Sequence, residues 1–503
     1  MKTERIGIIN VGASAFRMYI GEYSGDSERS LDYLVKPLRI GTDTFTQGYI
    51  GLENVKKATE ILKIFKLKLE EYGIHKYKAL CTSGVREATN QDFFLDYTHL
   101  HSGIKLEVLD PSEEVYIKYV GVRNSVPGFS TLEQNGLVFA NVSSGNVTLN
   151  ITLKNKLLYA GTLPYGSLRM RQMFRSISHI KRHKAIEEYV RKMIVSVVAT
   201  LDPEIKCSHL LGAGSSINLM LRLFKPSGNI ITREQLEEIY ARVRMMSLVE
   251  LTEELGLRKD EASVLLPTII TYLQLMDIVK NDYFSFSRLT FPHTMSLYYS
   301  GRIKDTHLSS RIKNTLISIA EKYRADTKHA RWVNYFARKF FDEFSDLHSL
   351  GRDSRVILEA SVILHDVGKY VSDDALATNS YHIIKSLKIP GLDSKMLLMA
   401  AAVVYEGNKT FHEKEPQEYA SMTSAERLTI RKLAGIMLIS KALDMGNNRH
   451  ITDIDIQMSD QIIVYARAER EPYLEMYTFD HQKLLFTETF GTAIELRARI
   501  SYD

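Results

Sequence analysis

Three short turns of small residues are the first candidates for a ligand-binding site in this chain. Gly12–Ala15 joins one apolar strand-like run to another, and Ser143–Asn146 does the same further along. Gly212–Ser216 lies between a short apolar run and a helical pattern. A turn without large side chains lets backbone N–H groups approach and hold a phosphate, although a single such turn is also typical of a plain hairpin. Their repetition predicts a duplicated fold that clamps a phosphate-bearing ligand between its halves.

Charged residues near these turns allow two interpretations. Asp110-Pro111 precedes Glu113 and Glu114, a pattern typical of a helix start with acids in its first turn. Favourable interaction with the helix dipole therefore explains the two acids without any catalytic role. Arg86 follows a buried strand-like run and is by itself equally compatible with a surface charge.

Composition bounds the class of protein. At 503 residues the chain is too long for one core, and its 45% hydrophobic and 25% charged content is ordinary. We expect neither a membrane helix nor a signal peptide, because no run approaches the required length and a strand begins within a few residues. Cys81 and Cys207 are too few for a disulfide framework, which fits a reducing cytoplasm. A net charge of +5 mildly favours anionic ligands, but interleaved acids argue against specific nucleic-acid binding.

The elements that must position these turns alternate between strands and helices in the first 300 residues. This alternation indicates a mixed α/β sheet covered by helices, opened in each half by a hairpin. The predicted strands and the clearest amphipathic helix are Ile6–Tyr23 (a hairpin), Leu31–Ile40, Asn54–Tyr72 (the helix), Tyr77–Thr82, Lys105–Leu109, Leu137–Ile151 (the second hairpin) and His209–Leu211.

From about Asp305 the pattern becomes almost entirely helical, and strands return near the end. We predict helices over His329–Phe344, Arg355–His365 and Ser424–Met445, strands over Ile454–Ala466 and Leu474–Phe479, and a helix or strand over Phe486–Tyr502. The predicted domains are 1–130, 131–304, 305–450 and 451–503.

Taken in order, these stretches resemble the exopolyphosphatase/guanosine pentaphosphate phosphatase family. Asn10–Ala15 stands at the family's D-x-G-S-N-S loop, and Thr82–Asn90 matches T-x-x-x-R-x-x-x-N. Leu109–Val122 matches S-G-x-E-E-A-x-L-I-Y-x-G-V, and Asn141–Leu149 stands at D-I-G-G-G-S-T-E-L. The resemblance implies an α/β duplicated actin-like (ASKHA, ribonuclease H-like) N-terminal half, an all-α HD-type domain and a small α+β tail.

The resemblance also implies roles for individual residues. Glu114 takes the general-base position with Glu113 beside it, and Arg86 is a charged clamp. Mg²⁺ or Mn²⁺ is the implied cofactor, and the partners are inorganic polyphosphate or a phosphorylated guanosine nucleotide, with the protein a homodimer. The implied phosphate-binding residues are Gly12, Ala13, Ser14, Ser143, Ser144, Gly145, Asn146, Gly212, Gly214 and Ser215.

The helical region carries a second candidate site. His329, the His365-Asp366 pair and Asp444 reproduce the H…HD…D pattern that surrounds a divalent metal in HD phosphohydrolases. In the family this region also serves as a structural or polyanion-binding module, so both alternatives stay open.

Several residues depart from the family pattern where phosphate and metal are held. Asn10 and Asn141 stand in place of Asp, so they are doubtful ligands for Mg²⁺, which prefers anionic oxygens. Thr148 replaces a Glu, and the L-R-E-G element is missing near Phe291–Thr294.

Three functional hypotheses follow. The first is a phosphatase that hydrolyses terminal phosphoanhydride bonds of polyphosphate or guanosine pentaphosphate. The others are a catalytically weak or inactive phosphate- or nucleotide-binding regulator, and a phosphohydrolase whose activity lies in the HD-type domain.

Overall fold

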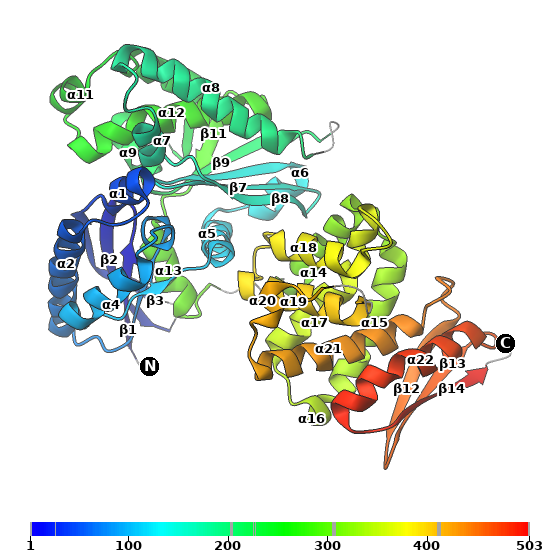
Figure 1. Ribbon diagram of the computed structural model, residues 1–503. Coiled ribbons are helices and arrows are strands. Elements are labelled where there is room, and N and C mark those ends of the chain that lie inside the picture. Colours follow the sequence, from blue (N-terminus) through cyan, green and yellow to red (C-terminus); the bar gives the residue numbers. More distant parts are fainter. Residues whose placement is uncertain are drawn as a thin grey trace. The chain divides into compact units, whose positions relative to one another are not determined.

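The chain forms two compact units in the computed structural model, Met1–Thr306 and His307–Asp503 (Figure 1). The structure describes residues 3–25, 27–201, 205–224, 226, 228–303, 308–409 and 414–500. Unit 1 contains both predicted hairpins, and unit 2 contains the helical region and the tail.

The first sheet of unit 1 is built on the first hairpin, with strand order β3-β2-β1-β4-β5. β1 (Glu4–Val11) and β2 (Ala15–Ser24) pair antiparallel, which confirms the predicted hairpin. β3 ends at Pro37, and the last residues of the predicted strand instead begin a helix at Ile40. The remaining elements are β3 (Ser27–Pro37), α1 (Ile40–Gln47), α2 (Leu52–Glu71), β4 (Tyr77–Cys81), α3 (Ser83–Arg86), α4 (Gln91–Ser102) and β5 (Glu107–Val108).

The second sheet repeats this arrangement, with strand order β10-β11-β9-β6-β7-β8. In both sheets a central strand pairs antiparallel with its hairpin partner on one side and parallel with a later strand on the other. The duplicated α/β fold is therefore confirmed. Its elements are α6 (Phe129–Asn135), β6 (Leu137–Val142), β7 (Val147–Leu153), β8 (Lys156–Leu163), α7 (Ser167–Met173), α8 (His179–Val198), β9 (His209–Ala213), α9 (Ser215–Phe224), β10 (Ile230–Thr232), α10 (Arg233–Val243), α11 (Leu248–Glu254), α12 (Lys259–Val279) and β11 (Tyr283–Phe286).

Two helices connect the halves of unit 1. α5 (Pro111–Ser125) begins where the Asp110 carboxylate accepts from the backbone N–H of Ser112 at 2.7 Å, as the sequence pattern predicts. α13 (Phe291–Tyr299) packs against β1, β2 and α5, and the Tyr23 hydroxyl lies 2.6 Å from the Ser296 hydroxyl. The chain thus returns to the first sheet after completing the second.

One helix, α12, is long and apolar enough to cross a membrane by length and composition alone, over Glu261–Val279. Of that stretch 67% is buried, and Leu265, Ile269 and Met276 belong to the core of the second half. The expectation that no run approaches this length missed α12, whose burial is typical of a core helix.

Unit 2 has one hydrophobic core, shared by its helices and its small sheet of order β12-β13-β14. The three long helices expected here are confirmed, with ends shifted by a few residues. The elements are α14 (Leu308–Lys322), α15 (Thr327–Glu343), α16 (Ser345–His348), α17 (Arg352–Leu364), a 3₁₀ turn (Val367–Tyr370), α18 (Leu376–Ser386), α19 (Ser394–Asn408), α20 (Gln417–Ala420), α21 (Ser424–Ala442), β12 (Ile451–Met458), β13 (Ile462–Ala468), α22 (Tyr473–Phe490) and β14 (Ile494–Ile500).

The predicted strand over Leu474–Phe479 is wrong, because these residues lie in α22. Glu475, Thr478, Phe479 and Phe486 are the buried residues of this helix, and their spacing of three, one and seven marks one helical face. A six-residue window was too short to distinguish that period from an apolar strand.

The contact between α5 and α13 gives a test of the fold. A Cβ on Gly121 would lie 2.1 Å from Thr294 Cγ2, so Gly121→Ala forces the two helices apart. We expect a loss of about 1–3 kcal/mol in the free energy of unfolding, measured by urea denaturation. In a Thr294→Ala background the loss should shrink, since Cγ2 is gone; an equal loss in both backgrounds would contradict this contact.

Candidate active site

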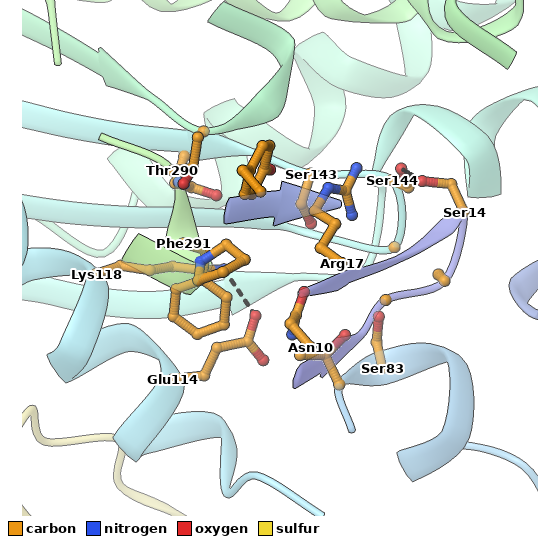
Figure 2. Close-up of a pocket in the computed structure, with 18 residues that line it drawn as sticks. Asn10, Ser14, Arg17, Ser83, Glu114, Lys118, Ser143, Ser144, Thr290 and Phe291 are labelled. Atoms are coloured by element: carbon orange, nitrogen blue, oxygen red, sulfur yellow. Dashed lines mark hydrogen bonds and ion pairs between the residues drawn. The ribbon is translucent and has the colours of Figure 1, made fainter. Parts of the chain in front are cut away.

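Both hairpin turns of unit 1 line one cavity, where Ser14 and Ser144 lie side by side (Figure 2). The Ser144 hydroxyl donates to the Ser14 hydroxyl at 2.7 Å, which joins the turn of the second sheet to that of the first. The N-terminus of α7 holds the second turn, because the backbone N–H of Leu168 donates to the Ser144 carbonyl at 2.9 Å. Two segments far apart in sequence thus form one rigid wall.

The cavity has a volume of about 70 Å³. Pockets that enclose a whole drug-sized ligand span roughly 300–1,000 Å³, so this one matches a small terminal group instead. Its lining combines small residues of the turns with a few charged side chains: Asn10, Gly12, Ala13, Ser14, Arg17, Tyr33, Thr82, Ser83, Glu114, Lys118, Asn141, Ser143, Ser144, Gly145, Gly214, Thr290, Phe291 and Pro292.

The third small-residue turn contributes less than the sequence suggested. Gly214 lines the cavity with φ of 102°, and a Cβ there would lie 2.9 Å from Asn141 Nδ2. Gly212 lies in β9 away from the lining, and the backbone of Ser215 begins α9 while its side chain is outside the described part of the chain. Asn146 is also away from the lining, because it closes its own turn by accepting from Ser143 Oγ at 2.8 Å.

Glu114 is the carboxylate of this lining, and it lies between two cations. Lys118, one helical turn further along α5, donates from Nζ to Oε1 at 2.7 Å, and Arg86 donates from Nη1 to Oε2 at 3.1 Å. Glu114 is only 5% exposed. Burial alone would raise the pKa of this carboxyl, but the charges of Lys118 and Arg86 outweigh it, so the pKa is lowered. The side chain is therefore an anion at neutral pH.

The other two predicted catalytic residues lie elsewhere. Arg86 is not part of the lining; it pairs with Glu114 and donates to the Leu109 carbonyl at 2.7 Å, so it positions Glu114. Glu113 also lies outside the lining and accepts from the Tyr299 hydroxyl at 3.1 Å. The two adjacent glutamates thus have different partners.

Sequence reasoning missed Lys118, Arg17 and the start of α13 as parts of the lining. Lys118 could have been found, since a Lys four residues after a Glu on a helix is the favourable spacing for an ion pair. Arg17, two residues past the first turn, carried no comparable signal, and Phe291 stands out only as the place where the L-R-E-G element is missing.

Comparison with known proteins identifies the family. Residues 33–294 match the Ppx/GppA phosphatase family, and residues 312–481 match domain III of the Ppx/GppA phosphatases. The chain belongs to the Ppx/GppA phosphatase family. The resemblance seen in the sequence motifs is thereby confirmed, and unit 2 corresponds to domain III.

Relatives of this Ppx/GppA member are distant. A guanosine-5'-triphosphate,3'-diphosphate pyrophosphatase of Photobacterium profundum is 19% identical over 435 residues, which covers 85% of this chain and 86% of that protein. An exopolyphosphatase structure from Cytophaga hutchinsonii has a TM-score of 0.53 at 18% identity and covers 59% of this chain and 98% of its own. An Aquifex aeolicus family member has a TM-score of 0.50 at 17% identity, covering 61% and 100%. These structures share the fold.

The cavity does not fit the divalent metal that the family implies. Glu114 is the only carboxylate among the described lining residues, and both of its oxygens are engaged by cations. Asn10 and Asn141 offer neutral amides where a hard cation prefers carboxylates. Asn10 is 4% exposed, and its Nδ2 has no hydrogen-bond partner in the described structure, so its orphan group is a donor.

In unit 2 the four residues of the H…HD…D pattern do meet. His329 Nδ1 lies 2.9 Å from Asp444 Oδ2, His365 Nε2 lies 3.2 Å from Asp366 Oδ1, and the two imidazole centroids are 5.5 Å apart. Within the described residues, however, no group of three or more His, Cys, Asp or Glu has an arrangement that could hold a metal ion.

Lysines surround Asp366 where a metal would have to bind it. Lys369 Nζ lies 2.5 Å from Asp366 Oδ2, and Lys441 Nζ lies 3.9 Å from Oδ1. Burial would raise the pKa of the Asp366 carboxyl, but the neighbouring charges of His365, Lys441 and Lys369 lower it. As arranged, this cluster does not fit a divalent cation.

The Glu114 ion pairs predict that the free energy of unfolding depends on pH. Because its pKa is lowered below the ordinary 4.5, Glu114 stabilises the fold above pH 4.5, and this contribution is lost as the pH falls through the folded pKa. Glu114→Gln should cost about 3–5 kcal/mol at pH 7, since two buried cations lose their partner. In urea denaturation the gap between variant and wild type should narrow below pH 4.5; a constant gap would contradict the pairing.

Because lysines surround Asp366, we expect that this residue does not contribute to any stabilisation of the protein by a divalent metal. Addition of Mn²⁺ should shift the thermal midpoint of the wild type and of Asp366→Ala equally, because ammonium groups already neutralise this carboxylate. Differential scanning fluorimetry with and without EDTA measures this. A stabilisation by Mn²⁺ that disappears in Asp366→Ala would show that the cluster binds metal.

Proposed function

We propose that the unit 1 cavity takes the terminal phosphate of inorganic polyphosphate or guanosine pentaphosphate and hydrolyses its phosphoanhydride bond. The observation that carries this proposal is the placement of one ionised carboxylate, Glu114, in a cavity of about 70 Å³ walled by two small-residue turns. Backbone N–H groups of such turns suit phosphate oxygens, and the cavity volume suits one terminal group. Membership of the phosphatase family supports the reaction class.

In this proposal Glu114 orients the attacking water and accepts its proton. A carboxylate has about four lone-pair positions, so bonds to Lys118 and Arg86 leave room for a water hydrogen bond. Arg86 fixes the carboxylate from the side away from the cavity. The lowered pKa of Glu114 makes it a weak base, so we expect slow turnover.

A second candidate function is binding of the same phosphorylated ligands without turnover. The engagement of both Glu114 oxygens, together with neutral Asn10 and Asn141, favours this alternative. The homodimer implied by the family resemblance also stays a prediction.

Phosphate release from polyphosphate and guanosine pentaphosphate tests the proposal. Glu114→Gln should lower the rate by about 10²-fold or more, because the water loses its proton acceptor. Glu113→Gln is the matched control: it removes the neighbouring charge of the same helix turn, outside the cavity, and should keep release within a few-fold of wild type.

The other outcomes separate the hypotheses. Release that survives in Glu114→Gln would overturn the proposed role of this residue. Loss only in Asp366→Ala would move the chemistry to unit 2. Absence of release from the wild type, with ligand-induced thermal stabilisation retained, would favour the binding function.

A further inference from the structure

We propose that the unit 1 cavity binds its phosphorylated ligand without a divalent cation, and that the ammonium group of Lys118 supplies the positive charge that a metal would bring. This inference rests on the proposed function only in that the ligand carries a phosphate, and it holds whether or not the phosphate is hydrolysed.

Lys118 is a buried residue of the cavity lining, where its charge interacts strongly with neighbouring groups. Its side chain is 5% exposed, lines the cavity and lies with Nζ 2.7 Å from Glu114 Oε1 and 5.1 Å from the centroid of the Phe291 ring. An ammonium group has three donors, and Glu114 takes one. In a site screened from water, the remaining donors and the charge itself attract an anion and repel a second cation.

The rest of the lining has the same preference. Arg17 adds a second positive charge beside the first turn, while Glu114 is neutralised by two cations. The orphan Nδ2 of Asn10 is a buried donor that an acceptor oxygen would satisfy and a metal ion would not. Phosphate oxygens accept hydrogen bonds from N–H groups. A metal ion needs ligands with free lone pairs, which N–H groups do not offer. A cavity lined by N–H donors therefore suits the phosphate itself.

Lys118 stands at a position that is apolar in the family pattern. In the stretch E-E-A-x-L-I-Y, which Glu113–Tyr119 matches, the residue at position 118 is an isoleucine. The loss of the loop carboxylates at Asn10 and Asn141 thus coincides with a gain of one buried cation in the same cavity. Both changes make the lining more positive, as a bound divalent cation would, which is expected if lysine stands in for the metal.

Binding of tripolyphosphate to the full chain tests this inference. By isothermal titration calorimetry the wild type should bind equally well, within about twofold, in EDTA and in excess Mg²⁺. Lys118→Met, which keeps the length of the side chain but removes its charge, should weaken binding in EDTA by at least about tenfold, the effect of one charge-assisted hydrogen bond. Lys118→Arg should bind within a few-fold of wild type.

Two controls keep the result interpretable. Lys78→Met removes one positive charge from unit 1 at an exposed ion pair with Glu107, outside the cavity, and should bind as wild type does. If Lys118→Met fails to fold because Glu114 loses a partner, the double variant Glu114→Gln/Lys118→Met replaces the ion pair with neutral groups and should also bind at least about tenfold more weakly.

The outcomes distinguish this inference from the proposed function. Binding that requires Mg²⁺ in the wild type, or that is unchanged in both Lys118 variants lacking the charge, overturns the inference and leaves hydrolysis possible. Metal-free binding lost with Lys118, but without phosphate release, supports the inference and overturns hydrolysis. Absence of binding under both conditions overturns both.

Discussion

One buried ion-pair cluster organises the candidate site: the carboxylate of Glu114 held between Lys118 and Arg86. Lys118 lies one turn along the same helix, α5, and Arg86 is the last residue of α3, so the pair with Arg86 fixes α5 against α3. A buried charge is tolerated only when it is paired, and removal of Glu114 leaves both cations without their partner. The placement of the catalytic candidate therefore depends on its ion pairs with Lys118 and Arg86.

The same solution appears in unit 2, where Asp366 is paired with Lys369 and lies near Lys441. In both units an acidic residue of a predicted site is neutralised by a lysine. Lysine differs from a divalent metal in having one positive charge and hydrogen-bond donors only, so it cannot act as a Lewis acid on a bound water. Each cluster keeps the charge balance of a metal site while lacking the chemistry of one.

Much of the fold could be predicted because its signals are local. Both hairpins, the Asp110 cap and the helical face of α15 follow from patterns within about fifteen residues. The return of α13 to the first sheet and the different partners of Glu113 and Glu114 depend on contacts between distant segments, which spacing alone does not encode. The same is true of Gly212 and Asn146, whose residue types fit a phosphate loop but whose backbone places them outside the cavity.

The lysine that suits a phosphate also acts against catalysis. A positive charge 2.7 Å from Glu114 stabilises the carboxylate and lowers its affinity for a proton, which is the property a general base requires. The same charge stabilises a bound phosphate before any bond is broken, so it strengthens the ground state as well as the transition state. A site built on Glu114 and Lys118 therefore favours phosphate affinity over turnover, because the lysine that attracts the phosphate also weakens the base.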